Sequence, residues 1–366
     1  MKVWSHGTNR FTFAPLETFM RLHTVLLASC LTLASFSTQA ETVSNLYQVR
    51  EAVANQDPAE RDQATQRALE TLVLRLTGDP KAFASPALAG LRGDPKQIIS
   101  QFGFENGQPP ALRVDFDPGA TDTALRQAGL PTWGANRPSI LAWWLTDSDN
   151  GSSLTGDGQA SAEPLRHAAQ HRGLPLRLPL ADLSEQPLAS AKALEGSDPA
   201  GLRSASQRYG ADALLAVHAT GSAGQLQAKW QVWLGNQHEQ GTAQGSDAAS
   251  LADAVLLAVS ERLAPRFIAK PGASTDMTLQ VQGVNLERYG QLSRLLDSFG
   301  ARLKTVEGDT ATYLVTGSPD QLRAQLSLAK LQETPADAAA PVPAGQAPVP
   351  QPQPQPSGPT PLRFHW

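Results

Sequence analysis

The chain repeats one pattern: a short alternating stretch, a capping residue with proline, an amphipathic stretch and a glycine. It first occurs where Leu46–Val53 precedes Asp57-Pro58 and helical spacing ends at Gly78. It recurs where Ala111–Phe116 precedes Asp117-Pro118. Alternation with period two predicts a half-buried strand, and a cap, a proline and a final glycine mark the two ends of a helix. The repetition therefore predicts small units that mix strands and helices.

Length and composition set the number of these units. A chain of 366 residues with 41% hydrophobic and 17% charged residues is too long for one ordinary domain and has enough apolar residues for real cores. We expect an α+β domain over residues 41–135 and a central α/β domain over 136–270. The central prediction rests on the apolar strands Ser139–Leu145 and Ala211–Val217, which are separated by helical segments.

The third unit, over residues 275–332, has the predicted order β-α-β-β-α. It is one strand short of a ferredoxin-like fold. Residues 335–361 form a tract rich in proline and glutamine, which we expect to be a disordered linker. The chain then ends with alternating Leu362, Phe364 and Trp366. We expect this tail to supply the missing strand and, because ordering it costs about as much as its burial gains, to exchange and bind a partner.

An apolar stretch near the start has the form of an export signal. A single arginine precedes a largely apolar run over residues 25–36, and the small residues Thr38 and Ala40 follow it. We expect residues 1–40 to be a leader that is cleaved after Ala40, which would release the mature protein into the periplasm. No other segment has the roughly 20 apolar residues that a membrane-spanning helix needs.

Two details of the leader leave alternatives open. Residues 1–19 do not resemble the charged start of a leader, so we expect Met20 to be the true initiator. Cys30, the single cysteine, lies in a small-residue context that also fits lipidation, and a lipoprotein anchored at Cys30 is the alternative localisation. We expect membrane attachment only in that case. Cleavage would leave the mature chain without a thiol or a disulfide, so its stability would come from packing.

Charge and missing motifs exclude several classes of function. The formal net charge of -4 supplies no basic field for phosphates, so we expect no nucleic-acid binding. The sequence contains no Gly-x-Ser-x-Gly elbow, no phosphate-binding loop and no dinucleotide fingerprint. We therefore expect neither a cofactor nor a catalytic site.

One group of side chains has the spacing of metal ligands. Glu163, His167 and His171 lie at i, i+4 and i+8 on a predicted helix and could present three ligands to a divalent metal. Because the internal glutamate of the His-Glu-x-x-His motif is missing, we favour ordinary surface residues and no metal. A metal-dependent hydrolase using these residues is the alternative. Tryptophans could likewise form a ligand-binding surface, but core packing is favoured: Trp133, Trp143, Trp144, Trp230 and Trp233.

Two segments carry a family resemblance. The segments Trp133–Pro138 (WGANRP) and Arg208–Leu215 (RYGADALL), together with the leader, resemble the proteobacterial family of exported proteins named domain of unknown function 2066 (DUF2066). The resemblance runs from about Leu46 to Leu331 and includes the aromatic C-terminal strand. It implies an exported bacterial protein but no activity, and the long proline tract departs from the family pattern.

The start of the second apolar strand resembles a further group of domains. Its Tyr-Gly-Ala-Asp-Ala sequence is similar to that of periplasmic anticodon-binding-like domains in curli-secretion, peptidoglycan-synthase-activating and flagellar-ring accessory lipoproteins. Those domains bind partners, which the resemblance implies for residues 136–270 by fold analogy. We therefore expect a non-enzymatic, envelope-associated protein that interacts with or helps to assemble an envelope protein partner. A periplasmic protein that binds a small molecule is a further alternative.

Overall fold

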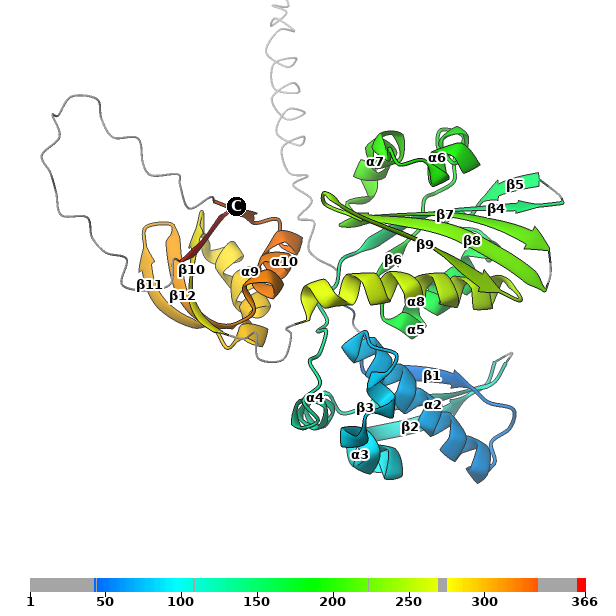
Figure 1. Cartoon of the computed structure of the whole chain (residues 1–366). Helices are drawn as coiled ribbons and strands as arrows, with labels where there is room; N and C mark the ends of the chain where they lie inside the picture. Colours follow the sequence, from blue (N-terminus) through cyan, green and yellow to red (C-terminus); the bar gives the residue numbers. More distant parts are fainter. Residues whose placement is uncertain are drawn as a thin grey trace, which may run out of the picture. The chain divides into compact units, whose positions relative to one another are not determined.

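Three β-sheets with packed helices organise the chain in the computed structural model (Figure 1). The structure describes residues 43, 45–107, 109–149, 151–222, 224–268, 275–334 and 361–366. The expected mixed α+β class is confirmed. The predicted leader, with Met20, Cys30 and Ala40, lies outside the described residues, as do residues 335–360 of the proline-rich tract. Within the described part of the chain, no helix combines the length and the apolar character that crossing a membrane requires.

The first sheet has three antiparallel strands in the order β1-β3-β2. They are β1 (Gln48–Ala52), β2 (Ile99–Glu105) and β3 (Ala111–Phe116), the last with the predicted bounds. One face packs on the long helix α2 (Pro58–Thr77), whose apolar stripe is buried with Val49, Leu112 and Val114. Helix α3 (Ala89–Gly93) and helix α4 (Pro118–Gln127) complete this cluster.

The central sheet has six strands. Its order is β5-β4-β7-β8-β9, with β6 also paired to β4. Strands β4, β6 and β7 run parallel, and the other neighbouring pairs are antiparallel. The strands span β4 (Ile140–Ser148), β5 (Gly151–Leu154), β6 (Leu176–Arg177), β7 (Ala213–Ser222), β8 (Gln225–Leu234) and β9 (Gln237–Gly245). Strand β6 is short because Pro175 and Pro179, on either side of it, lack the N–H donor of a ladder.

Helices cover both faces of the central sheet (Figure 1). One face packs on α5 (Glu163–Arg172) and α8 (Ala248–Phe267), and the other packs on α6 (Ala191–Glu195) and α7 (Ala200–Ser206). Coverage on both faces explains why β4 and β7 are nearly continuous apolar runs. The five tryptophans considered as a ligand surface are all buried, which confirms core packing.

The third sheet has the order β11-β12-β10-β14-β13. Its strands are β10 (Thr275–Gln282), β11 (Arg302–Glu307), β12 (Thr310–Gly317), β13 (Gln332–Glu333) and β14 (Leu362–His365). Helices α9 (Leu286–Leu296) and α10 (Pro319–Leu328) pack against it through five leucines: Leu292, Leu295, Leu296, Leu322 and Leu326. Asn285 caps α9, with its side chain accepting from the Arg288 N–H at 2.9 Å. Ser318 precedes α10 without a side-chain capping bond, and α10 begins with Pro319, whose fixed φ suits the first helical turn.

Two buried arginines join the first sheet and its helix to the central one. Arg137 is fully buried and donates to the carbonyl oxygens of Arg75 at 2.6 Å and Gly173 at 3.0 Å, with three further carbonyl bonds at 3.0–3.4 Å. Arg75, near the end of α2, donates through Nε to the His171 carbonyl at 3.3 Å. Four of these carbonyls lie at the carboxyl-terminal ends of α2 and α5, which are the negative ends of both helix dipoles: those of Arg75, His171, Arg172 and Gly173.

The segment that leads into Arg137 packs on the same junction. The Trp133 N–H donates to the Leu76 carbonyl at the end of α2. The Trp133 ring stacks on Phe267 of α8, with ring centroids 5.6 Å apart, and the guanidinium carbon of Arg137 lies 4.2 Å from the centroid of the Trp133 ring. Gly173 has φ +65°, and a Cβ there would lie 2.6 Å from Arg75 Cγ, so this position requires glycine.

We expect Arg137→Lys to lower the free energy of unfolding by roughly 2–4 kcal/mol. Lysine keeps the charge but cannot reach five carbonyls with a planar fork, so buried acceptors lose their donor. Urea unfolding measures the change. The matched control is Arg203→Lys, because Arg203 is exposed and makes a single carbonyl bond, to Gly235 at 3.3 Å. A shift below about 0.5 kcal/mol for both variants would contradict the role given to Arg137.

Candidate functional site

The C-terminal strand β14 lies inside the third sheet, between β10 and β13. It pairs parallel with β10, from Leu279↔Leu362 to Gln282↔His365. On its other side it pairs antiparallel with β13, through Gln332↔His365 and Glu333↔Phe364. A ferredoxin-like order would bring the last strand back antiparallel to the first, because strands joined through a helix run in the same direction and only the hairpin between β11 and β12 reverses it. Here β13 has that direction, and β14 runs opposite to it.

Side chains of the tail fill the space between sheet and helices. Phe364 is 3% exposed in the core of the third sheet, and Leu362 and Trp366 are half-buried against the same core. The guanidinium of Arg288 lies 5.3 Å from the Trp366 ring centroid. The three residues predicted to bind a partner therefore contact this chain's own sheet. We call the position between β10 and β13, which β14 fills, the strand slot.

The two ends of the connection to β14 are neighbours. The Thr334 N–H donates to the Arg363 carbonyl at 2.8 Å, and Thr334 Oγ1 lies 3.1 Å from His365 Nδ1. A two-residue turn could join strands so placed, yet 26 residues (335–360) lie between Thr334 and Pro361. Because loop-closure entropy grows with the logarithm of length, a freely flexible connection of this length costs about 2 kcal/mol more than the short turn. The tail is thus joined to its slot by far more chain than the pairing needs.

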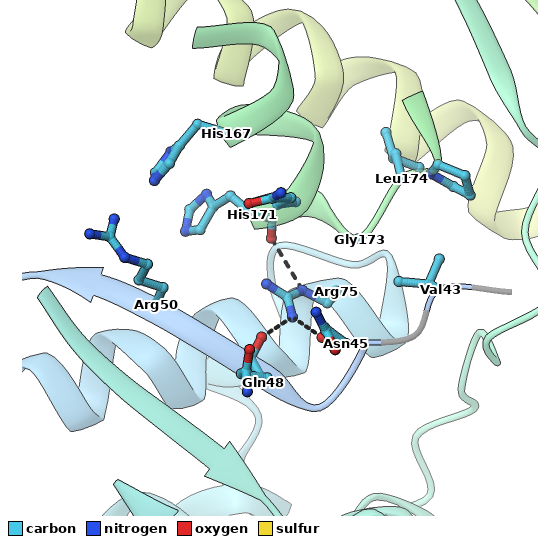
Figure 2. Close-up of a pocket in the computed structure, with 11 residues that line it drawn as sticks. Val43, Asn45, Gln48, Arg50, Arg75, His167, His171, Gly173 and Leu174 are labelled. Carbon is cyan, nitrogen blue, oxygen red and sulfur yellow. Dashed lines mark hydrogen bonds between the residues drawn. The ribbon is translucent and has the colours of Figure 1, made fainter. Parts of the chain in front are cut away.

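A second feature is a cavity of about 360 Å³ at the junction held by Arg75 (Figure 2). Its wall is formed by the start of β1, the end of α2 and the last turns of α5 with the segment after them. Eleven residues line it: Val43, Asn45, Gln48, Arg50, Arg75, His167, Gln170, His171, Gly173, Leu174 and Pro175.

The predicted metal ligands are not brought together. His167 and His171 both line the cavity, but Glu163 does not, and its carboxylate lies 3.6 Å from Arg166 Nη1 at the start of α5. The i to i+8 spacing separates Glu163 and His171 by about 12 Å along the helix axis. Within the described ranges, no cluster of three His, Cys, Asp or Glu side chains could hold a metal ion.

His171 instead belongs to a polar cluster that the sequence did not reveal. Its Nδ1 lies 3.1 Å from Asp253 Oδ1 of α8, and its Nε2 lies 3.0 Å from Thr71 Oγ1 and 3.6 Å from Glu51 Oε1. Burial opposes protonation of the ring, but the hydrogen bonds with Asp253 and Glu51 outweigh it and raise the pKa of His171. The partners come from β1, α2 and α8, so no local motif marks them.

A second buried histidine was also missed. His218 on β7 lies 2.6 Å from Glu195 Oε1 and 2.7 Å from Asp147 Oδ2. Lys229 Nζ lies 2.7 Å from the other oxygen of Glu195. Burial lowers the pKa of His218, but the bonds to the two carboxylates outweigh it and raise the pKa. Because both ring nitrogens are held by carboxylates, this cluster fixes α6 and β4 to β7 and leaves no free nitrogen for acid-base chemistry.

We expect the stabilisation that depends on His171 to disappear at alkaline pH. A folded-state pKa above the unfolded value gives stability that is fully present below about pH 6.5 and is lost as the pH rises through the raised pKa. The difference in urea midpoint between the parent protein and His171→Gln should therefore shrink from pH 6 to pH 9. Glu163→Gln, on the same helix but outside the cluster, serves as the control. A pH-independent difference for His171→Gln would refute the assignment.

Comparison with known families gives a match over the first sheet and its helices. Residues 40–134 match the family described as Domain of unknown function (DUF8605), which is about a quarter of the chain and ends in the Trp133-Gly134 segment at the junction. No curated protein matches the sequence. DUF8605 is a different family from DUF2066, which two segments of the sequence resemble, and the resemblance to DUF2066 stays a prediction. The matched family carries no activity that could be transferred to this chain.

Proposed function

We propose that this chain is a non-enzymatic protein-interaction or assembly factor of the cell envelope, and that its strand slot binds an extended segment of a partner. The observation that carries the proposal is the position of β14 between β10 and β13 at the end of a 26-residue connection. Such a slot offers backbone hydrogen bonds on both sides and a pocket for alternate side chains, which is how β-strand addition gives affinity and specificity.

The energetics of the tail favour exchange. Burial of Phe364 contributes roughly 1.5–3 kcal/mol, and Leu362 and Trp366 add less because they are half-buried. Ordering each residue of the tail costs about 1–2 kcal/mol of backbone entropy. Because the tail is tethered to the same chain, its effective concentration at the strand slot is nevertheless on the order of millimolar. A partner must therefore bind the slot more tightly than the tail does, or gain additional contacts elsewhere.

The finer fold assignments support the same function. We infer a ferredoxin-like relationship for residues 275–334 from the order β10-α9-β11-β12-α10, with the tail as an inserted parallel strand. We infer an anticodon-binding-like relationship for residues 136–270 from strands β4 and β7, which are parallel and covered by helices on both faces. Domains of both kinds commonly bind other macromolecules, which is a fold-level analogy.

Location in the envelope rests on the sequence. The leader over residues 1–40 supports export to the periplasm, and lipidation at Cys30 would add a membrane anchor. The relationship to DUF2066 is part of the same proposal. We do not carry forward the hydrolase alternative, because Glu163 and His171 engage separate partners at opposite ends of α5.

We expect a labelled peptide of residues 361–366 to bind a version of the protein that ends at Pro361 at least tenfold more tightly than it binds the intact chain. In the intact chain the tethered tail occupies the slot and competes. Fluorescence anisotropy measures both affinities. A peptide carrying Phe364→Ala should bind poorly because its anchor is lost, whereas one carrying Arg363→Ala should bind normally because Arg363 is exposed.

Two outcomes would count against the strand slot. One is equal affinity of the peptide for both versions, and the other is equal binding of the two substituted peptides.

Envelope partners captured by crosslinking in cells should increase when the tail is removed. Loss of all partners with the tail would indicate that the tail itself is the ligand.

A further inference from the structure

The cavity at the junction has a one-sided charge. Four of its eleven lining residues are basic, Arg50, Arg75, His167 and His171, and none is acidic. Asn45, Gln48 and Gln170 add amide groups. Carboxylates outside the lining pair with Arg50 and His171, whereas Arg75 and His167 have no acidic partner among the described residues. A lining that holds unpaired basic groups and no carboxylate of its own is the composition expected for an anion site.

The positive charge of Arg75 has no direct counter-ion. Arg75 is 4% exposed, and among the described residues no carboxylate lies within ion-pair distance of it. Its guanidinium donates to the carbonyls of Asn45, Leu46 and Gln48 at 3.3, 2.9 and 2.7 Å. Burial lowers the pKa of Arg75 to about 10, and Glu51 opposes that effect in part. A buried cation satisfied by dipoles alone leaves a positive potential that an anion in the cavity would reduce.

Arg137 adds to this potential. It is fully buried, also has no carboxylate partner among the described residues, and donates to the Arg75 carbonyl. Burial, together with the nearby charge of Arg75, lowers the pKa of Arg137 to about 9. Arg75 thus lines a space large enough for a small ligand, and Arg137, which is not part of the lining, is hydrogen-bonded to the Arg75 carbonyl.

The cavity has a polar end and an apolar end. In Figure 2, the side chains of Arg50, His167 and His171 gather on one side, and Val43 and Leu174 lie on the other. Arg50 is held by Glu105 at 2.8 Å, which fixes its guanidinium but lies outside the cavity wall. His167 makes no hydrogen bond or ion pair with another described residue, and its ring is exposed.

We propose that this cavity binds a small organic carboxylate, with the anionic group held by Arg50 and His167 and the apolar part against Val43 and Leu174. The two-ended lining favours an amphiphilic carboxylate over inorganic phosphate, which has no apolar part. This inference is independent of the strand slot, because none of its residues belongs to the third sheet.

Isothermal titration of the intact chain with hexanoate tests the proposal, with hexanamide, acetate and inorganic phosphate as comparison probes. Hexanoate should bind at least tenfold more tightly than hexanamide, which lacks the charge, and than acetate and phosphate, which lack the apolar part. Arg50→Gln and His167→Gln should each weaken hexanoate binding by about tenfold.

The matched control is Arg113→Gln. Arg113 lies 3.6 Å from the same Glu105, has nearly the same exposure as Arg50, and does not line the cavity. It should leave hexanoate affinity unchanged, which separates loss of the cavity cation from loss of the surface ion pair. Absence of hexanoate binding, equal binding of hexanamide, or equal weakening by Arg50→Gln and Arg113→Gln would each overturn the proposal. Tighter binding of phosphate than of hexanoate would also overturn it.

Discussion

The arrangement of the first two sheets depends on guanidinium groups that donate to backbone carbonyls at the ends of helices. Arg75 and Arg137 hold the carboxyl-terminal turns of α2 and α5 in contact, without an acidic partner among the described residues. The bonds are charge-assisted and lie where both helix dipoles are negative, so they offset part of the cost of burying two cations. Packing of Trp133 between Arg137 and Phe267 extends the junction to α8.

The same interaction creates the cavity. Arg75 donates to the Gln48 carbonyl at the start of β1 and its side chain lies beside Gly173 at the end of α5, so it contacts both the strand and the helix. The space that remains is lined by the groups that hold the junction together. A ligand there would contact β1, α2 and α5 at once and would strengthen the junction by mass action.

Much of the secondary structure could be predicted because its signals are local. Alternation gave the bounds of β3, and the cap, proline and final glycine at Asp57-Pro58 and Gly78 gave both ends of α2. The contacts of Arg137 and His171 could not be predicted, because their partners lie in distant segments and many are backbone carbonyls, which carry no residue-type signal. Alternation in the tail predicted a strand, but it does not encode direction, and β14 is parallel to β10.

The most direct test of strand exchange is hydrogen-deuterium exchange on the intact chain, followed for β14 and for β12 of the same sheet. If the tail leaves its slot without unfolding of the sheet, the amides of β14 will exchange much faster than those of β12, which pairs with β10 and β11 on both sides. Equal protection of the two strands would mean that β14 is released only by global unfolding, and the strand slot would then not be open to a partner.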